Sequence, residues 1–273
     1  MEKPGSVQKR AGARRFADKA ATGRGRCEMR RLIVSVLSAA AGAAPAAAAD
    51  WYTGVKSSEP DYSNNIVLDA SLTATTKGSK FVDVSVTVAP QDSLEKTGLR
   101  VRADGMLGEY KYKTDKGVPI TARQEQASVM GGYEWVSRNF TYAVYAGISG
   151  QNDTLSPADP SNSVQGKHIG LKVSGEFYDT RRKNTLLMGY ASFSTNASSY
   201  YVRLKYGWAV GERVYMGPEI MAMGNTFYQQ WRAGVHLTGW KMGPVQLGVS
   251  GGYLSDAKLG SGLYTVVDAR VGF

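Results

Sequence analysis

From Ile66 to the C-terminus, apolar and polar residues alternate one by one in segment after segment. Val82 to Val88, Leu99 to Leu107 and Val202 to Trp208 are each apolar at every second position. No stretch of convincing length repeats with the period of a helix, and a period of two is typical of half-buried strands. The pattern therefore predicts twelve strands, at residues 64–76, 80–89, 98–113, 123–137, 140–150, 166–178, 184–195, 200–210, 213–223, 228–240, 244–255 and 262–273.

The two faces of these predicted strands differ in charge. In eleven of them one face can be chosen that carries no charged residue, and only 184–195 leaves the choice open. A soluble sandwich would turn such faces inward against each other. A membrane barrel would turn them outward to lipid and enclose the polar residues.

Four features favour the barrel. The chain has an export signal, described next, and an even strand number, which returns both ends to the periplasm. Phe273 ends an alternating strand, which resembles the C-terminal signature read by the barrel-assembly machinery of bacterial outer membranes. Aromatic residues on the apolar faces lie near strand ends, where they suit the two bilayer interfaces: Tyr133, Trp135, Tyr142, Phe177, Tyr206, Trp208, Trp231 and Tyr253. The predicted fold is thus an all-β, antiparallel transmembrane β-barrel of about twelve strands; a further strand at 51–58 would raise the number and break the parity.

The first 49 residues predict a cleavable signal peptide. Arg30 and Arg31 precede an apolar run that ends in three alanines, with the expected cleavage between Ala49 and Asp50. Met29 is a candidate true start, because the stretch before it is unusually long. The alternative, a transmembrane helix, is disfavoured because the Leu, Ile and Val part is short. The predicted domains are therefore a signal peptide at 1–49 and an outer-membrane barrel at 50–273.

Removing the signal peptide also removes most of the basic charge. Residues 1–49 hold 10 Lys and Arg against 3 Asp and Glu, which leaves 23 against 20 for the rest of the chain. A net charge of +3 on the predicted barrel no longer favours nucleic acid as a partner.

The polar faces predict a charged lumen with equal numbers of both signs. Ion selectivity needs a ring of one sign, whereas balanced charges suit paired networks that fill the interior. A narrow or occluded pore is expected, and the plainer interpretation is that these charges only stabilise the fold. The predicted lumen charge network comprises Asp69, Asp83, Arg100, Arg102, Asp104, Glu134, Lys172, Glu176, Arg203, Lys205, Glu219, Arg232, Asp268 and Arg270.

The sequence predicts no catalytic residues, cofactor or metal site. Cys27 is the one cysteine, and His168 and His236 are the two histidines. Residues 248–252 match G-x-S-x-G, but the match lies inside a strand, whereas the motif needs a strand-to-helix turn. An arrangement of Ser250 with His236 and an acid stays open, with a structural histidine as the favoured interpretation. Residues 152–165, the longest predicted outer loop, contain two prolines, which suit either recognition or simple order.

Several short blocks resemble the alphaproteobacterial cellulose biosynthesis protein BcsS family. The most specific is the loop-and-strand block 155–176, and the others are 51–55, 69–73, 98–102 and 217–219. The resemblance implies an accessory role in cellulose production or export at the outer membrane, and it brings no catalytic residues.

The expected function is that of a non-enzymatic outer-membrane barrel that assists cellulose or other exopolysaccharide biosynthesis or export. The expected partners are outer-membrane lipid, glucan, other cellulose synthase subunits and the barrel-assembly machinery. Two alternatives stay open, namely a general diffusion porin and an outer-membrane lipid hydrolase or acyltransferase.

Overall fold

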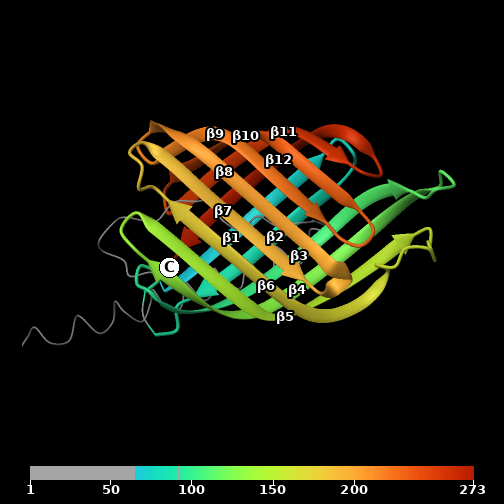
Figure 1. Ribbon diagram of the computed structural model, residues 1–273, viewed down its shortest axis with the longest axis horizontal. Coiled ribbons are helices and arrows are strands. Elements are labelled where there is room, and N and C mark those ends of the chain that lie inside the picture. Colours follow the sequence, from blue (N-terminus) through green and yellow to red (C-terminus); the bar gives the residue numbers. More distant parts are fainter. Residues whose placement is uncertain (1–64, 92) are drawn as a thin grey trace, which may run out of the picture. The chain divides into compact units, whose positions relative to one another are not determined.

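The computed structural model describes residues 65–91 and 93–273, which form a closed antiparallel barrel (Figure 1). Each strand pairs with its neighbours in sequence, and the first pairs with the last. This confirms the predicted all-β fold of twelve strands; the predicted signal peptide with its Ala49–Asp50 cleavage site, the start at Met29 and the extra strand at 51–58 lie outside the described residues. The strands are β1 (Ile66–Thr75), β2 (Lys80–Val88), β3 (Gly98–Lys113), β4 (Pro119–Val136), β5 (Phe140–Ser156), β6 (Gly166–Asp179), β7 (Thr185–Ser194), β8 (Ser199–Gly211), β9 (Val214–Gly224), β10 (Gln229–Met242), β11 (Val245–Asp256) and β12 (Gly260–Gly272).

The helical content of the described part is one short 3-10 turn, Asn196–Ser198. Accordingly, no helix there has the length and apolar character needed to cross a membrane.

The two ends of the described chain meet where the barrel closes. The amide of Asn65 donates to the carbonyl of Phe273 at 3.0 Å, and the amide of Phe273 donates to the carbonyl of Ile66 at 2.9 Å. Closure removes the exposed strand edges that an open sheet would present. We call this the proximal end of the barrel, and the opposite end, with the β1–β2, β3–β4 and β5–β6 loops, the distal end.

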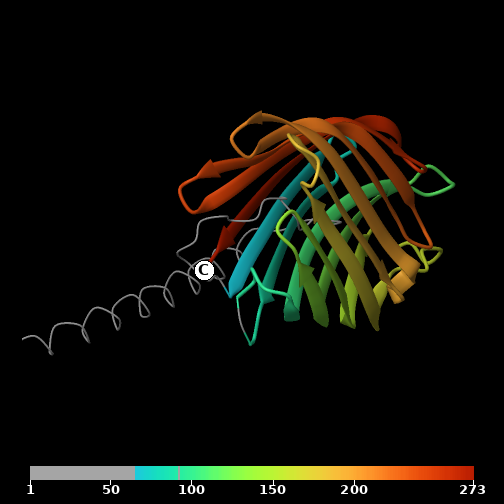
Figure 2. The same cartoon turned by 60° about the vertical axis from the view of Figure 1, so that its left-hand side comes forward.

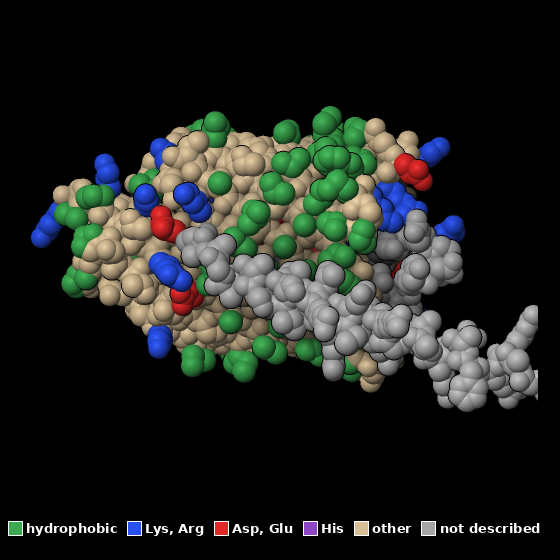
Figure 3. Space-filling view, turned by 180° about the vertical axis from the view of Figure 1, so that it is seen from behind, with side chains coloured by type: hydrophobic (Ala, Val, Ile, Leu, Met, Phe, Trp, Pro, Cys, Tyr) green, Lys and Arg blue, Asp and Glu red, His purple; other side chains and the backbone are tan. Residues whose placement is uncertain are grey.

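Apolar side chains are spread over the outer surface of the barrel, as the face in Figure 3 shows. Ile148 is 61% exposed, Val249 44% and Val202 44%. In a soluble sandwich these positions would be buried between two sheets. The alternation read from the sequence is therefore real, and its apolar side faces outward from a closed barrel.

Aromatic side chains lie on this outer surface near both ends. Toward the proximal end, the ring of Trp135 lies 4.8 Å from that of Tyr133 and 4.5 Å from that of Tyr142. Toward the distal end, Trp231 and Tyr253 pair at 5.6 Å. Two aromatic girdles that flank an apolar band are typical of barrels that cross a bilayer.

One side of the distal rim stands higher than the rest. β3, β4 and β5 have 16, 18 and 17 residues, whereas β1, β2 and β7 have 10, 9 and 10. We call the distal parts of β3–β5 the wall; they project at the right of Figure 1. The same oblique strands are seen from another side in Figure 2.

The predicted bounds were wrong at the wall. β4 begins at Pro119 instead of residue 123, and β5 continues to Ser156 instead of residue 150, so the β5–β6 loop shortens to 157–165. The polarity is reversed there: Arg123 and Glu125 face outward and pair at 3.0 Å, while Ala122 and Leu155 are buried inside. The prediction relied on apolar outer faces, so it missed the distal parts of β4 and β5, whose outer faces are polar.

Candidate functional site

A group of ion pairs spans the lumen between β3 and β6. Arg102 contacts Asp104 at 2.8 Å and Glu176 at 2.9 Å, and Lys172 contacts Asp104 at 2.8 Å. Ser128 donates a hydrogen bond to the same Asp104 carboxylate at 2.9 Å. We call these five residues the β3–β6 bridge. It connects β3 with β6, which are separated by β4 and β5. It therefore crosses the lumen instead of running along the inner surface of the sheet.

A second group spans the lumen between β8 and β12. Arg203 contacts Glu219 at 2.7 Å and Asp268 at 3.4 Å, and Lys205 contacts Asp268 at 3.1 Å. Ser71 adds a hydrogen bond to Asp268 at 3.0 Å. We call this the β8–β12 bridge. Its four charged side chains have relative exposures of 2% or less, so water is largely excluded from them.

The remaining members of the predicted lumen network lie on the inner face of the barrel, outside these two bridges. Arg100 pairs with Glu134 at 2.6 Å, and Arg270 with Asp69 at 3.5 Å. Arg232 donates to the side-chain carbonyl of Gln230 at 2.7 Å, and Asp83 is buried on the inner face of β2. Ion pairs thus join at least twelve of the fourteen predicted residues, six of each sign.

Aromatic side chains pack between the charges. The Arg102 guanidinium lies 5.4 Å from the ring centre of Tyr145 and 5.7 Å from that of Tyr190. Tyr264 donates a hydrogen bond to Glu219 at 2.8 Å. Cation–π and hydrogen-bond contacts of this kind compensate part of the loss of water around buried charges.

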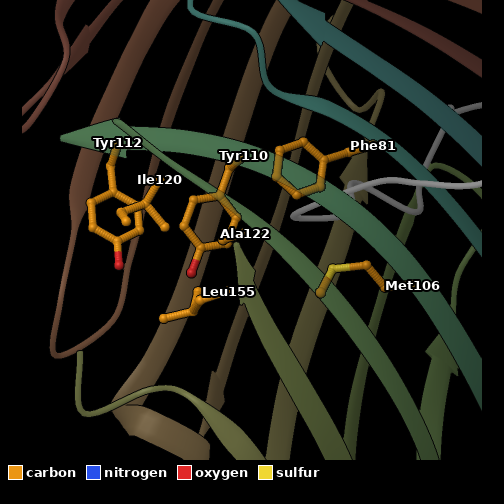
Figure 4. Close-up of a cluster of buried hydrophobic side chains, with 7 residues drawn as sticks. All are labelled: Phe81, Met106, Tyr110, Tyr112, Ile120, Ala122 and Leu155. Carbon is orange, nitrogen blue, oxygen red and sulfur yellow. The ribbon is translucent and has the colours of Figure 1, made fainter. Parts of the chain in front are cut away.

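An apolar cluster lies inside the wall near the distal mouth (Figure 4). It consists of Phe81, Met106, Tyr110, Tyr112, Ile120, Ala122 and Leu155. The β9–β10 loop closes on it, because Phe227 packs edge-on against Tyr112 at 4.9 Å and Tyr228 stacks on Tyr110 at 5.9 Å. The sequence did not single out this cluster; the nearest signal is the repeated tyrosine at the end of β3.

The β5–β6 loop is fastened to the same cluster. Tyr112 donates to Asp159 at 2.7 Å and accepts from the amide group of Asn162 at 2.9 Å. Hydrogen bonds from Ser161 and Tyr112 hold the pKa of Asp159 below its usual range. The proline-bearing loop that we considered for recognition is therefore an ordered part of the mouth.

Small cavities remain in the distal half of the lumen. One of about 60 Å³ lies above the β3–β6 bridge, and Asp104 and Lys172 line it. Another of about 20 Å³ lies beside Tyr110 and Phe227. A water molecule needs about 10–15 Å³ of such space, so the larger cavity holds about four to six waters and the smaller cavity one or two.

Ser250 and His236 do not form a catalytic pair. They lie opposite each other on β11 and β10, but Ser250 accepts from Arg203 at 2.8 Å and donates to Glu219 at 3.1 Å. The two ring nitrogens of His236 contact the Thr238 hydroxyl at 2.9 Å and a backbone carbonyl at 3.2 Å. A nucleophile needs a hydrogen bond to its base, so the serine belongs to the β8–β12 bridge.

The other histidine is also committed to structure. His168 contacts the carbonyl of Val164 at 3.1 Å. Within residues 65–91 and 93–273, no cluster of three or more His, Cys, Asp or Glu side chains has the arrangement of a metal site.

Comparison with solved structures gives a porin and a transporter among the matches. The chain is similar to the KdgM porin, with a TM-score of 0.42 and 10% identity over 76% of this chain and 99% of that chain. It is also similar to the Pseudomonas putida toluene transporter TodX, with a TM-score of 0.43 and 9% identity over 78% of this chain and 89% of that chain.

The sequence comparisons identify the family. No curated protein matches the chain. The sequence profile of the family described as cellulose biosynthesis protein BcsS matches residues 75–273, which include the end of β1 and every later strand. The chain belongs to the BcsS family of cellulose biosynthesis proteins.

Proposed function

We propose that this protein is a non-enzymatic accessory component of cellulose biosynthesis or export, located in the outer membrane. The family supports the cellulose role. The observation that carries the finer proposal is the lumen, in which charged bridges cross between β3 and β6 and between β8 and β12.

The apolar band supports the membrane location. Along β3 it runs from Leu99 to Leu107, eight residue steps, or about 26 Å along the strand at ~3.3 Å per residue. A tilt of about 40° reduces this to a height of about 20 Å, close to the ~25 Å apolar band of outer-membrane barrels. The periplasmic side would then be the proximal end, and the wall would stand in the medium outside the cell.

The charged bridges in the lumen support an accessory role and argue against a path that transports glucan or solutes. A glucan chain or a diffusing solute would have to displace the β3–β6 bridge, and removing one partner of a buried ion pair costs roughly 3–5 kcal/mol. The barrel would then act as an anchor or a receptor for the machinery that makes or moves the polymer.

Two measurements test this function. In planar lipid bilayers, the purified barrel is expected to give no large steady conductance steps, and large, weakly selective steps would make it a diffusion porin instead. In cells, the barrel is expected to co-purify with a cellulose synthase complex, and deletion of its gene is expected to reduce secreted cellulose. Unchanged cellulose in the deletion strain would contradict the accessory role.

A further inference from the structure

The larger cavity lies where the lumen opens toward the distal end. β3 and β4 form one side of it, and the ends of β8 and β9 form the other. Its floor is the Asp104–Lys172 ion pair of the β3–β6 bridge, so the cavity does not continue through the barrel at this point.

The cavity has a neutral lining. Asp104 and Lys172 neutralise each other at 2.8 Å, and the other lining side chains are uncharged amides, hydroxyls, tyrosines and a methionine. A charged ligand would find no counterion here, and burying it without one would be costly. The chemistry therefore selects a neutral ligand rich in hydroxyl groups.

Two glutamine side chains on β4 line the cavity with amide groups that are not engaged. Gln124 is only 7% exposed, and Gln126 lies two residues further along the same inner face. Neither amide makes a hydrogen bond to any residue in the described part of the chain. Buried amides are normally paired, so the uncommitted amide of Gln124, with that of the half-buried Gln126 beside it, is suited to bind a polar ligand.

Tyrosine rings complete the lining opposite the glutamines. Tyr200 is at the start of β8, and Tyr228 belongs to the β9–β10 loop and is held from behind by its stack on Tyr110. The C–H face of a sugar ring packs well on aromatic rings, while its hydroxyls reach amides. Pockets with this combination of apolar walls and a few placed polar groups are typical of ligand sites.

We propose that this cavity binds a single neutral sugar residue, the end of a β-glucan chain presented from the distal side. About 60 Å³ holds four to six waters, or roughly 120–180 Å³ of liquid, which is of the size of one sugar ring. The choice of glucan among neutral sugars rests on the proposed function. The closed floor makes the site a receptor for a chain end, which cannot pass through at this point.

The test is calorimetric titration of the purified barrel in detergent with cellotetraose. Wild-type protein is expected to bind it, and not to bind an acidic oligogalacturonate of similar length. Gln124→Leu and Gln126→Leu are each expected to weaken binding by about fivefold to tenfold, the loss of one hydrogen bond. The matched control is Gln229→Leu, the same change on an exposed side chain at the mouth, with unchanged binding expected.

Unfolding curves of all variants show whether each one keeps the fold. Methionine, closer in length to glutamine, replaces leucine at the same position in any variant that unfolds. The absence of cellotetraose binding by wild type, or equal binding by the Gln124, Gln126 and Gln229 variants, would overturn the site. Tight binding of the acidic sugar would overturn its neutral character.

Cellulose secretion separates this result from the proposed function. If the site fails while the deletion strain still secretes less cellulose, the accessory role survives without this receptor. If cellotetraose binds as expected but the deletion changes nothing, the accessory role fails and the sugar site remains.

Discussion

Asp104 is the carboxylate on which the β3–β6 bridge depends. It holds Arg102 at 2.8 Å and Lys172 at 2.8 Å, and it accepts a hydrogen bond from Ser128. In Asp104→Asn, Arg102 keeps its pair with Glu176, whereas the described contacts of the Lys172 ammonium are reduced to Ser128 at 3.3 Å and a neutral amide. The substitution therefore leaves the buried Lys172 ammonium without its carboxylate partner.

The distance sets the size of the effect. Two unit charges 2.8 Å apart attract by about 6 kcal/mol at an effective dielectric constant of ~20. Desolvation offsets part of this attraction, so we expect Asp104→Asn to lower the free energy of unfolding by roughly 3–5 kcal/mol. Lys172→Met removes the charge that Asp104→Asn leaves unpaired. The double variant should therefore lose less free energy of unfolding than the sum of the two single losses, by about 1–3 kcal/mol.

Guanidinium unfolding of the barrel in phospholipid vesicles, followed by tryptophan fluorescence, measures all four proteins of this cycle. The exposed pair Arg123–Glu125 supplies the matched control, and Glu125→Gln should cost less than about 1 kcal/mol. A loss below 1 kcal/mol for Asp104→Asn, with additive single losses, would mean that the bridge is solvated like a surface ion pair and that the lumen is open.

Three further predictions concern the outer surface, the mouth and the inner serine. Val173→Arg, in the middle of the apolar band, should destabilise the barrel in lipid by about 2–4 kcal/mol, whereas Thr154→Arg on the wall should cost less than about 1 kcal/mol; equal costs in vesicle unfolding would place the band outside the bilayer. Because its pKa is lowered on folding, Asp159 should stabilise the mouth above the ordinary carboxyl pKa and lose this effect as the pH falls through its lowered pKa. Hydrogen exchange at the Ser161 amide should follow that loss, and Asp159→Asn should abolish the pH dependence; protection that is unaffected by pH or by this change would refute it. Ser250→Ala should leave the lipid composition of the cell unchanged while costing about 1 kcal/mol of stability, and an altered lipid profile would revive the hydrolase alternative.

Much of the fold could be read from the alternation alone. Side chains alternate between the two faces of a strand, so a strand with one apolar face can be recognised from its own residues. Where the local signal failed, the reason is physical. In β7, Leu186, Met188 and Tyr190 face inward while Leu187 and Phe193 face outward, and a strand that is apolar on both faces has no readable register.

The sequence by itself determined where most strands lie and that each has one apolar and one polar face, because both depend only on residues close together in the chain. The closed barrel decided that the apolar faces point outward and added the buried Asp153 of β5 to the inward acids. The tertiary structure alone decided which charges pair. Arg102 and Glu176 are 74 residues apart and Arg203 and Asp268 are 65 apart, and they meet only because the stagger of every intervening strand adds up to bring them to one height in the barrel. The mouth, where Tyr112 fastens the β5–β6 loop and two glutamines face a cavity, depends on the same accumulated stagger and on loop contacts that no local period encodes.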